Sequence, residues 1–173
     1  MKALILEDNF RKLEQTLIVL RNYSLEHAHY NNLFQVYCRY LNKKLLDYFD
    51  LIILDLCFFV NKPLSGGKIL PSREAGFHFL VKMAEMEYHV PVIIFSSEEK
   101  YLPRLETFLF PSFNEYCSPY QNVHIPKHYL EEHYKLYIER NKKLLTEIDT
   151  FVIGHAHNRT ELNQLVKDFV ESK

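Results

Sequence analysis

Two short apolar runs, each followed by acidic residues, constrain the fold of this 173-residue chain more than any other feature of its sequence. Residues 3–6 are followed by Glu7 and Asp8, and residues 51–54 are followed by Asp55. Apolar runs without alternation are typical of strands buried on both faces of a parallel sheet. Functional groups of such sheets gather at the carboxyl ends of the strands, so the three carboxylates meet if these strands are neighbours. Such a pocket suits a hard divalent cation, and Mg2+ is the expected occupant.

Strand and helix patterns alternate along the rest of the chain. The patterns predict further strands at residues 24–30, 90–95 and 150–153, and helices at about residues 9–22, 31–48, 75–87 and 160–170. Repeated strand–helix units imply a parallel sheet with right-handed crossovers. The predicted fold class is therefore α/β.

The four strand ends carry the motifs of one family. Residues 6–9 read Leu-Glu-Asp-Asn, residues 53–56 Ile-Leu-Asp-Leu, residues 94–97 Ile-Phe-Ser-Ser, and residues 151–154 Phe-Val-Ile-Gly. In this order the chain resembles the receiver domain of bacterial two-component response regulators, whose motifs are an acidic pair, a phosphoryl-accepting Asp, a Ser or Thr, and a Lys. The resemblance implies a doubly wound, flavodoxin-like sheet of five parallel strands in the order 2-1-3-4-5.

The resemblance also implies a role for each residue of the pocket. Asp55 is the expected phosphoryl acceptor, and Glu7 and Asp8 are expected to hold Mg2+ together with it. The backbone carbonyl of Cys57 is the further protein ligand that the family provides, and the Ser96 hydroxyl is expected to bind a phosphoryl oxygen. The cation is needed because two further carboxylates would otherwise repel a phosphoryl group from Asp55.

The fourth motif departs from the family. Gly154, followed by His155, stands where receivers have Lys followed by Pro, and Phe151 matches the aromatic switch position three residues earlier. Loss of the Lys removes one charge-assisted hydrogen bond to the phosphoryl group, about 1.5 to 3 kcal/mol. A second alignment stays open, in which residues 123–127 form the last strand and Lys127 supplies the cation.

Two segments are longer than the family has at the same places. The chain is expected to be a single domain over residues 1–173, with insertions at about 57–74 and 98–149. The first insertion is expected to overhang the acidic pocket. The second is expected to hold about two helices, including a long amphipathic one at residues 129–147, and a proline-rich connection at 111–126. Receivers meet partners on this side, so the enlargement indicates a dedicated protein partner.

Composition and charge narrow the classes of function. A formal net charge of -1 and a pI near 6.8 give no broad attraction to nucleic acid or to an anionic membrane. The chain begins with a predicted strand, and no apolar run approaches the roughly 18 residues of a membrane span, so we expect a cytoplasmic protein. The 3 cysteines are widely spaced and suit reduced thiols better than a disulfide framework.

Histidine and tyrosine patterns suggest two further sites. Zinc is a weak alternative, because Cys117 is the one cysteine candidate to complete the histidine sets at positions 155 and 157 or 124, 128 and 133. Tyr129, Tyr134 and Tyr137 share one predicted helix and are candidates for a partner or homodimer face.

The sequence thus predicts a stand-alone, atypical receiver that accepts a phosphoryl group on Asp55 with Mg2+ and signals through protein–protein binding, without being an enzyme. Its expected partners are a sensor histidine kinase or phosphotransfer protein and a downstream protein. The alternative is a phosphorylation-independent pseudo-receiver adaptor. A third reading, a hydrolase of phosphorylated compounds, lacks a general acid such as an Asp two residues after Asp55, where Cys57 stands.

Overall fold

The computed structural model describes residues 1–36, 39–40, 45–60, 70–72, 74–97 and 101–173. Its centre is a five-stranded parallel sheet in the order β2-β1-β3-β6-β7. The strands, in that order, are Glu26–Tyr30, Lys2–Leu6, Leu51–Leu54, Val92–Phe95 and Val152–Ala156. Counting only the strands of this sheet, the order is 2-1-3-4-5, so the predicted fold class and strand order are confirmed.

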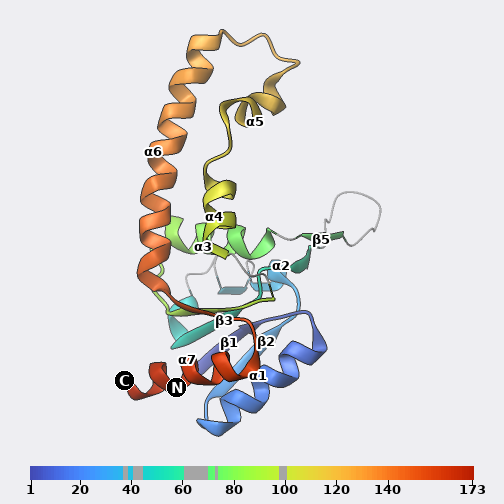
Figure 1. Cartoon of the computed structure of the whole chain (residues 1–173), viewed down its shortest axis with the longest axis vertical. Helices are drawn as coiled ribbons and strands as arrows, with labels where there is room; N and C mark the ends of the chain where they lie inside the picture. Colours follow the sequence, from blue (N-terminus) through green and yellow to red (C-terminus); the bar gives the residue numbers. More distant parts are fainter. Residues whose placement is uncertain (37–38, 41–44, 61–69, 73, 98–100) are drawn as a thin grey trace.

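The apolar runs lie in the middle of the sheet, where helices cover both faces. All residues of β3 and β6 are buried, as are those of β1 after Lys2. Helices α1 (Phe10–Asn22) and α7 (Arg159–Glu171) lie on one face, and α3 (Ala75–Glu85) lies on the other (Figure 1). Two-sided burial explains why these strands carry no polar alternation.

Asparagine caps fix the starts of the two helices on the same face. The Asn9 side chain accepts hydrogen bonds from the backbone N–H groups of Arg11 and Lys12, and Asn158 accepts one from Glu161. Such caps satisfy N–H groups that have no partner within the helix. The predicted helices at 9–22 and 160–170 are therefore confirmed to within about a residue.

The segment predicted as a helix from residue 31 to about 48 is described only in part. Its described part holds the short helix α2 (Leu33–Val36) and a 3-10 turn, η2 (Leu46–Tyr48), while residues 37–38 and 41–44 lie outside the described residues. The Tyr40 ring packs edge-on against Phe49 with centroids 5.2 Å apart, and its hydroxyl lies 2.8 Å from that of Tyr30. The predicted helix is therefore tested only at the described positions, where α2 and η2 are helical in type.

The first expanded segment contains an antiparallel strand pair, β4 (Phe58–Val60) and β5 (Leu70–Ser72). Residues 61–69 and 73 lie outside the described residues. The expectation that this segment overhangs the acidic residues falls largely on that part of the chain.

The second expanded segment is mostly helical. It holds α4 (Tyr101–Leu109), α5 (Phe113–Cys117), the 3-10 turn η3 (Ser118–Tyr120) and α6 (Lys127–Phe151). The 25 residues of α6 make a helix about 37 Å long, which extends with α5 away from the sheet (Figure 1). The alignment that made residues 123–127 a strand is wrong, because Lys127 opens α6 and pairs with Glu131 at 3.4 Å with 79% of its side chain exposed.

Candidate functional site

The carboxyl ends of β1 and β3 bring the three predicted acidic residues together. Leu6 pairs with Leu54, so the next residues, Glu7 and Asp55, are neighbours, and the Asp55 N–H donates to the Leu6 carbonyl at 2.9 Å. One carboxylate oxygen from each of Glu7, Asp8 and Asp55 lies within 4.8 Å of the others. Over the described ranges, no other group of three or more His, Cys, Asp or Glu side chains is placed to hold a metal, so neither histidine set makes a zinc site there.

Glu7 has the features of a metal ligand. Its side chain is buried, Oε1 accepts a hydrogen bond from the Asn9 N–H at 2.7 Å, and Oε2 is buried without a hydrogen-bond partner among the residues that the structure describes. Burial, and then the charge of Asp55, raise the pKa of Glu7 to about 8. An unsatisfied buried oxygen is costly, and a divalent cation among the three carboxylates would satisfy it. These residues therefore suit Mg2+.

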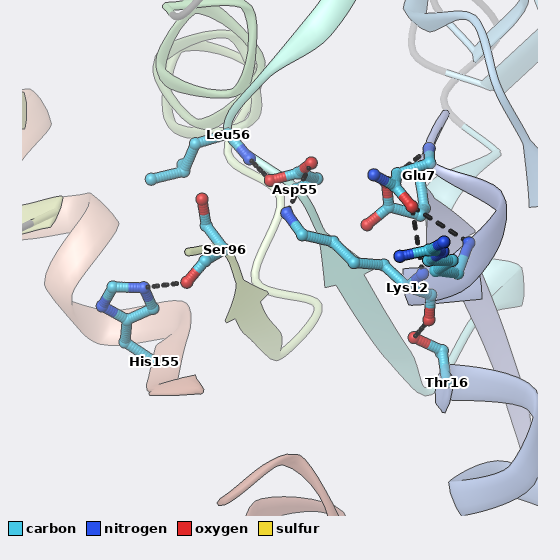
Figure 2. A network of polar contacts seen from close by, with 9 residues as sticks. Glu7, Lys12, Thr16, Asp55, Leu56, Ser96 and His155 are labelled. Carbon is cyan, nitrogen blue, oxygen red and sulfur yellow. Dashed lines mark hydrogen bonds and ion pairs between the residues drawn. The ribbon is translucent and has the colours of Figure 1, made fainter. Parts of the chain in front are cut away.

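Both oxygens of Asp55 are already in use. The carboxylate is 3% exposed; Oδ1 accepts from the Leu56 N–H at 2.8 Å, and Oδ2 accepts from Lys12 Nζ at 3.0 Å (Figure 2). Lys12 is the third residue of α1, and its side chain reaches from that helix to the end of the central strand. Asp55 thus has an internal counter-ion.

Sequence reasoning missed Lys12, although the sequence contains a signal for it. The capping asparagine Asn9 fixes the start of α1, so Arg11 and Lys12 both fall in its first turn, which has no acidic residue. Cations are disfavoured at a helix N-terminus because they face the positive end of the helix dipole. A lysine in that place, beside a predicted carboxylate cluster, indicates an ionic partner outside the helix.

Ser96 follows β6 on the other side of Asp55. It is buried, its N–H donates to the Ala156 carbonyl at 3.1 Å, and Figure 2 shows Ser96 and Lys12 on opposite sides of Asp55. Nε2 of His155 donates to the Ser96 carbonyl at 3.3 Å. Burial is the main cause that lowers the pKa of His155, so this ring does not replace the charge of the family's lysine.

The register of the last strand corrects the assignments of Gly154 and Phe151. An irregularity between Val92 and Ile93 shifts the pairing, so Gly154 lies beside Ile93 within the strand. A Cβ on Gly154 would lie 2.6 Å from the Leu165 side chain, which points it toward α7 and not toward the acidic cluster. Phe151 is the last residue of α6 and is buried in the core.

The described end of the last strand still lacks a lysine. β7 ends at Ala156, which lies beside Phe95, and His157 follows. The strand is therefore atypical at its carboxyl end, as predicted, but the residues that stand there are Ala156 and His157 and not Gly154.

Gly76 positions the backbone around Asp55. Its N–H donates to the Leu56 carbonyl at 3.1 Å, and a Cβ at this position would lie 2.6 Å from Leu56 Cα and 2.8 Å from the Asp55 carbonyl oxygen. Only glycine permits so close an approach of α3 to the end of β3. Sequence reasoning did not single out Gly76. Cys57, next along the chain, is half-buried, and the role of its carbonyl as a ligand stays a prediction.

Solved structures similar to this chain include receiver domains. A signal receiver domain of two-component signal transduction (histidine kinase) from Clostridium thermocellum superposes with a TM-score of 0.53 at 16% identity, covering 98% of this chain and 97% of that one. A CheY-like response regulator receiver domain protein from Methanospirillum hungatei gives 0.51 at 12% identity, covering 99% and 94%. The chain has the receiver fold.

The receiver fold is the extent of what these similarities show. No family model and no curated protein matches the sequence. At 12% to 16% identity, the roles of individual residues in this receiver fold have to be argued from the site itself. Among the described residues, no helix has the length and apolar character needed to cross a membrane.

Proposed function

We propose that this chain is an atypical response-regulator receiver that accepts a phosphoryl group on Asp55 in the presence of Mg2+ and signals by binding another protein. The observation that carries the proposal is the cluster of Glu7, Asp8 and Asp55 at the carboxyl ends of β1 and β3, with an oxygen of Glu7 left unsatisfied. Ligands of open α/β sheets bind at these strand ends.

Each residue has a defined task in the proposed reaction. An Asp55 oxygen forms a bond to the phosphorus of the donor, and the bond from phosphorus to the leaving group breaks with its electron pair going to that group. Glu7, Asp8, Asp55 and the Cys57 carbonyl would hold Mg2+, which supplies neutralisation of the negative charge that meets there. The Ser96 hydroxyl donates a hydrogen bond to a phosphoryl oxygen.

We propose that residues 1–173 form one domain and that the segment 98–149 carries the output. The phosphoryl donor would be a sensor histidine kinase or a phosphotransfer protein, and a downstream protein would bind the extended helical region. Support comes from large apolar side chains that this region leaves exposed, including Val123, Tyr129 and Leu136.

A second candidate is a phosphorylation-independent adaptor with the same fold. One observation favours it: Asp55 already has a counter-ion in Lys12, and the described end of β7 provides no lysine for a phosphoryl group. In such an adaptor the partner would bind equally well to the parent and to Asp55→Asn.

The two candidates are separated by incubating the protein with Mg2+ and acetyl phosphate and measuring its intact mass. The receiver gains one phosphoryl group, Asp55→Asn does not, and Asp47→Asn, which changes an exposed aspartate of η2, labels like the parent. Labelling that persists in Asp55→Asn would place the acceptor elsewhere. A parent protein that gains no mass would favour the adaptor.

A further inference from the structure

We infer that Lys12 is a tethered counter-ion that occupies Asp55 until a divalent cation displaces it. The inference rests on the proposed function only in placing the cation among Glu7, Asp8 and Asp55. It concerns what must leave the site before the cation binds.

The first step is the occupancy of the Asp55 carboxylate. The Leu56 N–H donates a hydrogen bond to Oδ1 at 2.8 Å, and Lys12 Nζ donates one to Oδ2 at 3.0 Å. The carboxylate is 3% exposed, so solvent has little access to it. The hydrogen bond to Oδ1 comes from the neighbouring backbone, whereas Oδ2 is held by a long side chain from another element. A cation that binds Asp55 through Oδ2 competes with the lysine for this oxygen.

The second step is charge. The candidate cation site is bounded by carboxylate oxygens that lie within 4.8 Å of one another, and Oδ2 of Asp55 already holds the Lys12 ammonium. Lys12 also acts on Glu7, where its charge opposes the effect of burial. Two cations that shared one carboxylate oxygen in a poorly solvated site would repel each other strongly. The ammonium and a divalent cation are therefore alternatives at this carboxylate.

The third step is that the Lys12 side chain can leave the site toward solvent. Its side chain is 21% exposed, unlike that of Asp55, and the ammonium sits on a flexible four-carbon stem. Displacement needs only rotation of this stem toward solvent, with no movement of α1. Release is favoured only when another cation compensates Asp55, since removal of the lysine alone would leave a buried, unpaired charge.

The consequence is that Lys12, a residue of the same chain, blocks the cation site at Asp55. Without a divalent cation, the carboxylate proposed to accept the phosphoryl group is held by Lys12. With the cation bound, Oδ2 is released from the lysine. Cation binding therefore acts as a precondition for freeing Asp55 from its internal counter-ion, through one side chain.

The test is a calorimetric titration with Mg2+ alone. Lys12→Met removes the ammonium, Lys12→Gln keeps a polar side chain without charge, and Arg11→Gln removes a charge from the exposed neighbour in the same helical turn. Both Lys12 variants are expected to bind Mg2+ at least tenfold more tightly than the parent (about 1.4 kcal/mol), whereas Arg11→Gln stays within about twofold because exposed charges are screened. Equal or weaker binding by folded Lys12 variants would overturn the inference.

A second measurement uses the unaltered chain. The 15N resonance of the Lys12 ammonium is followed by NMR while Mg2+ is added, and is expected to shift or broaden as the ammonium leaves Asp55. A resonance that stays unchanged at saturating Mg2+ contradicts displacement. If Mg2+ binds neither the parent nor any variant, the proposed metal site is wrong as well. If Mg2+ binds but phosphoryl transfer fails, the displacement of Lys12 is unaffected.

Discussion

The end of the sheet that carries the acidic cluster and the helical extension made by α5 and α6 are built in opposite ways. The cluster is fixed by backbone pairing of buried strands and by close approach of α3 at Gly76. The outer part of the extension is held by side chains: rings of Phe113 and Tyr116 pack on Tyr134, and the Tyr134 hydroxyl donates to the Pro111 carbonyl at 2.8 Å. The cluster is therefore positioned by backbone pairing, while the outer part of the extension depends on individual side-chain contacts.

Helix α6 has a half that is buried in the core and a half that belongs to the exposed extension. Toward its C-terminus Leu144, Ile148 and Phe151 are buried in the core. In its middle, Asn141 donates to the Leu109 carbonyl at 2.6 Å and Arg140 forms an ion pair with Glu85. Further toward its N-terminus, exposed side chains predominate. Two of the three tyrosines considered for a partner face, Tyr134 and Tyr137, are already packed against α5, which leaves Tyr129 exposed.

The largest effect is expected from truncation in the buried half of α6. Ile148→Ala should lower the free energy of unfolding by about 2 to 5 kcal/mol, because it leaves a cavity in the core. Leu136→Ala, on the exposed half with 63% of the side chain accessible, should change it by less than about 0.5 kcal/mol. Urea denaturation of both variants measures this. Similar losses of unfolding free energy in the two variants would contradict the difference in burial between the two halves of α6.

Glu7 is the expected source of a pH effect in the cluster. The pKa of Glu7 is raised from 4.5 to about 8, so the folded state favours the protonated acid. This contribution to stability is fully present below pH 4.5 and is lost as pH rises toward 8. Without divalent cation, the contribution of Glu7 to the free energy of unfolding should therefore fall by a few kcal/mol from about pH 5 to 8. The lowered pKa of His155 acts in the opposite direction, since stability rises with pH where this ring loses its proton.

Glu7→Gln tests the source of that pH effect. The variant cannot ionise at this position, so its stability should decline less over the same pH range, and Glu132→Gln serves as a control on the exposed surface of α6. Saturating Mg2+ should also reduce the decline in the parent, because it favours the ionised form of Glu7. Identical pH slopes for the parent and Glu7→Gln in urea denaturation would contradict the assignment.

A smaller loss is expected from overpacking beside Asp55. Gly76→Ala places a Cβ 2.6 Å from Leu56 Cα, and relief of this overlap requires backbone movement, at about 1 to 3 kcal/mol. Because the moved backbone carries Asp55, Mg2+ affinity measured by calorimetry should fall too. Ala75→Gly, a change in the same turn, provides a comparison in which no side chain is added. Unchanged affinity in Gly76→Ala would show that the cluster tolerates movement.

The smallest expected effect lies in the extension. Tyr134→Phe removes the hydrogen bond to the Pro111 carbonyl but keeps the ring against Tyr116, so stability should fall by about 1 kcal/mol. Hydrogen exchange should increase around α5 and the start of α6 and stay unchanged at β1 and β3. Faster exchange at the strands would show that the two regions are coupled.

The sequence by itself determined the buried central strands, the acidic edge of the sheet and the starts of α1 and α7. Uninterrupted apolar runs require burial on both faces, and that requirement led to parallel strands whose ends carry Glu7, Asp8 and Asp55. The caps at Asn9 and Asn158 are equally local, since each acts on N–H groups within three residues. Such signals act between residues close in sequence and do not depend on distant parts of the chain.

Only the tertiary structure decided the remaining features, because each depends on a neighbour far away in sequence. The shift that moves Gly154 beside Ile93 depends on pairing between β6 and β7, and motif matching along the chain does not contain it. The need for glycine at position 76 arises from the approach of α3 to Leu56. The ion pair of Lys12 with Asp55 joins residues 43 positions apart and forms only when α1 packs beside β3.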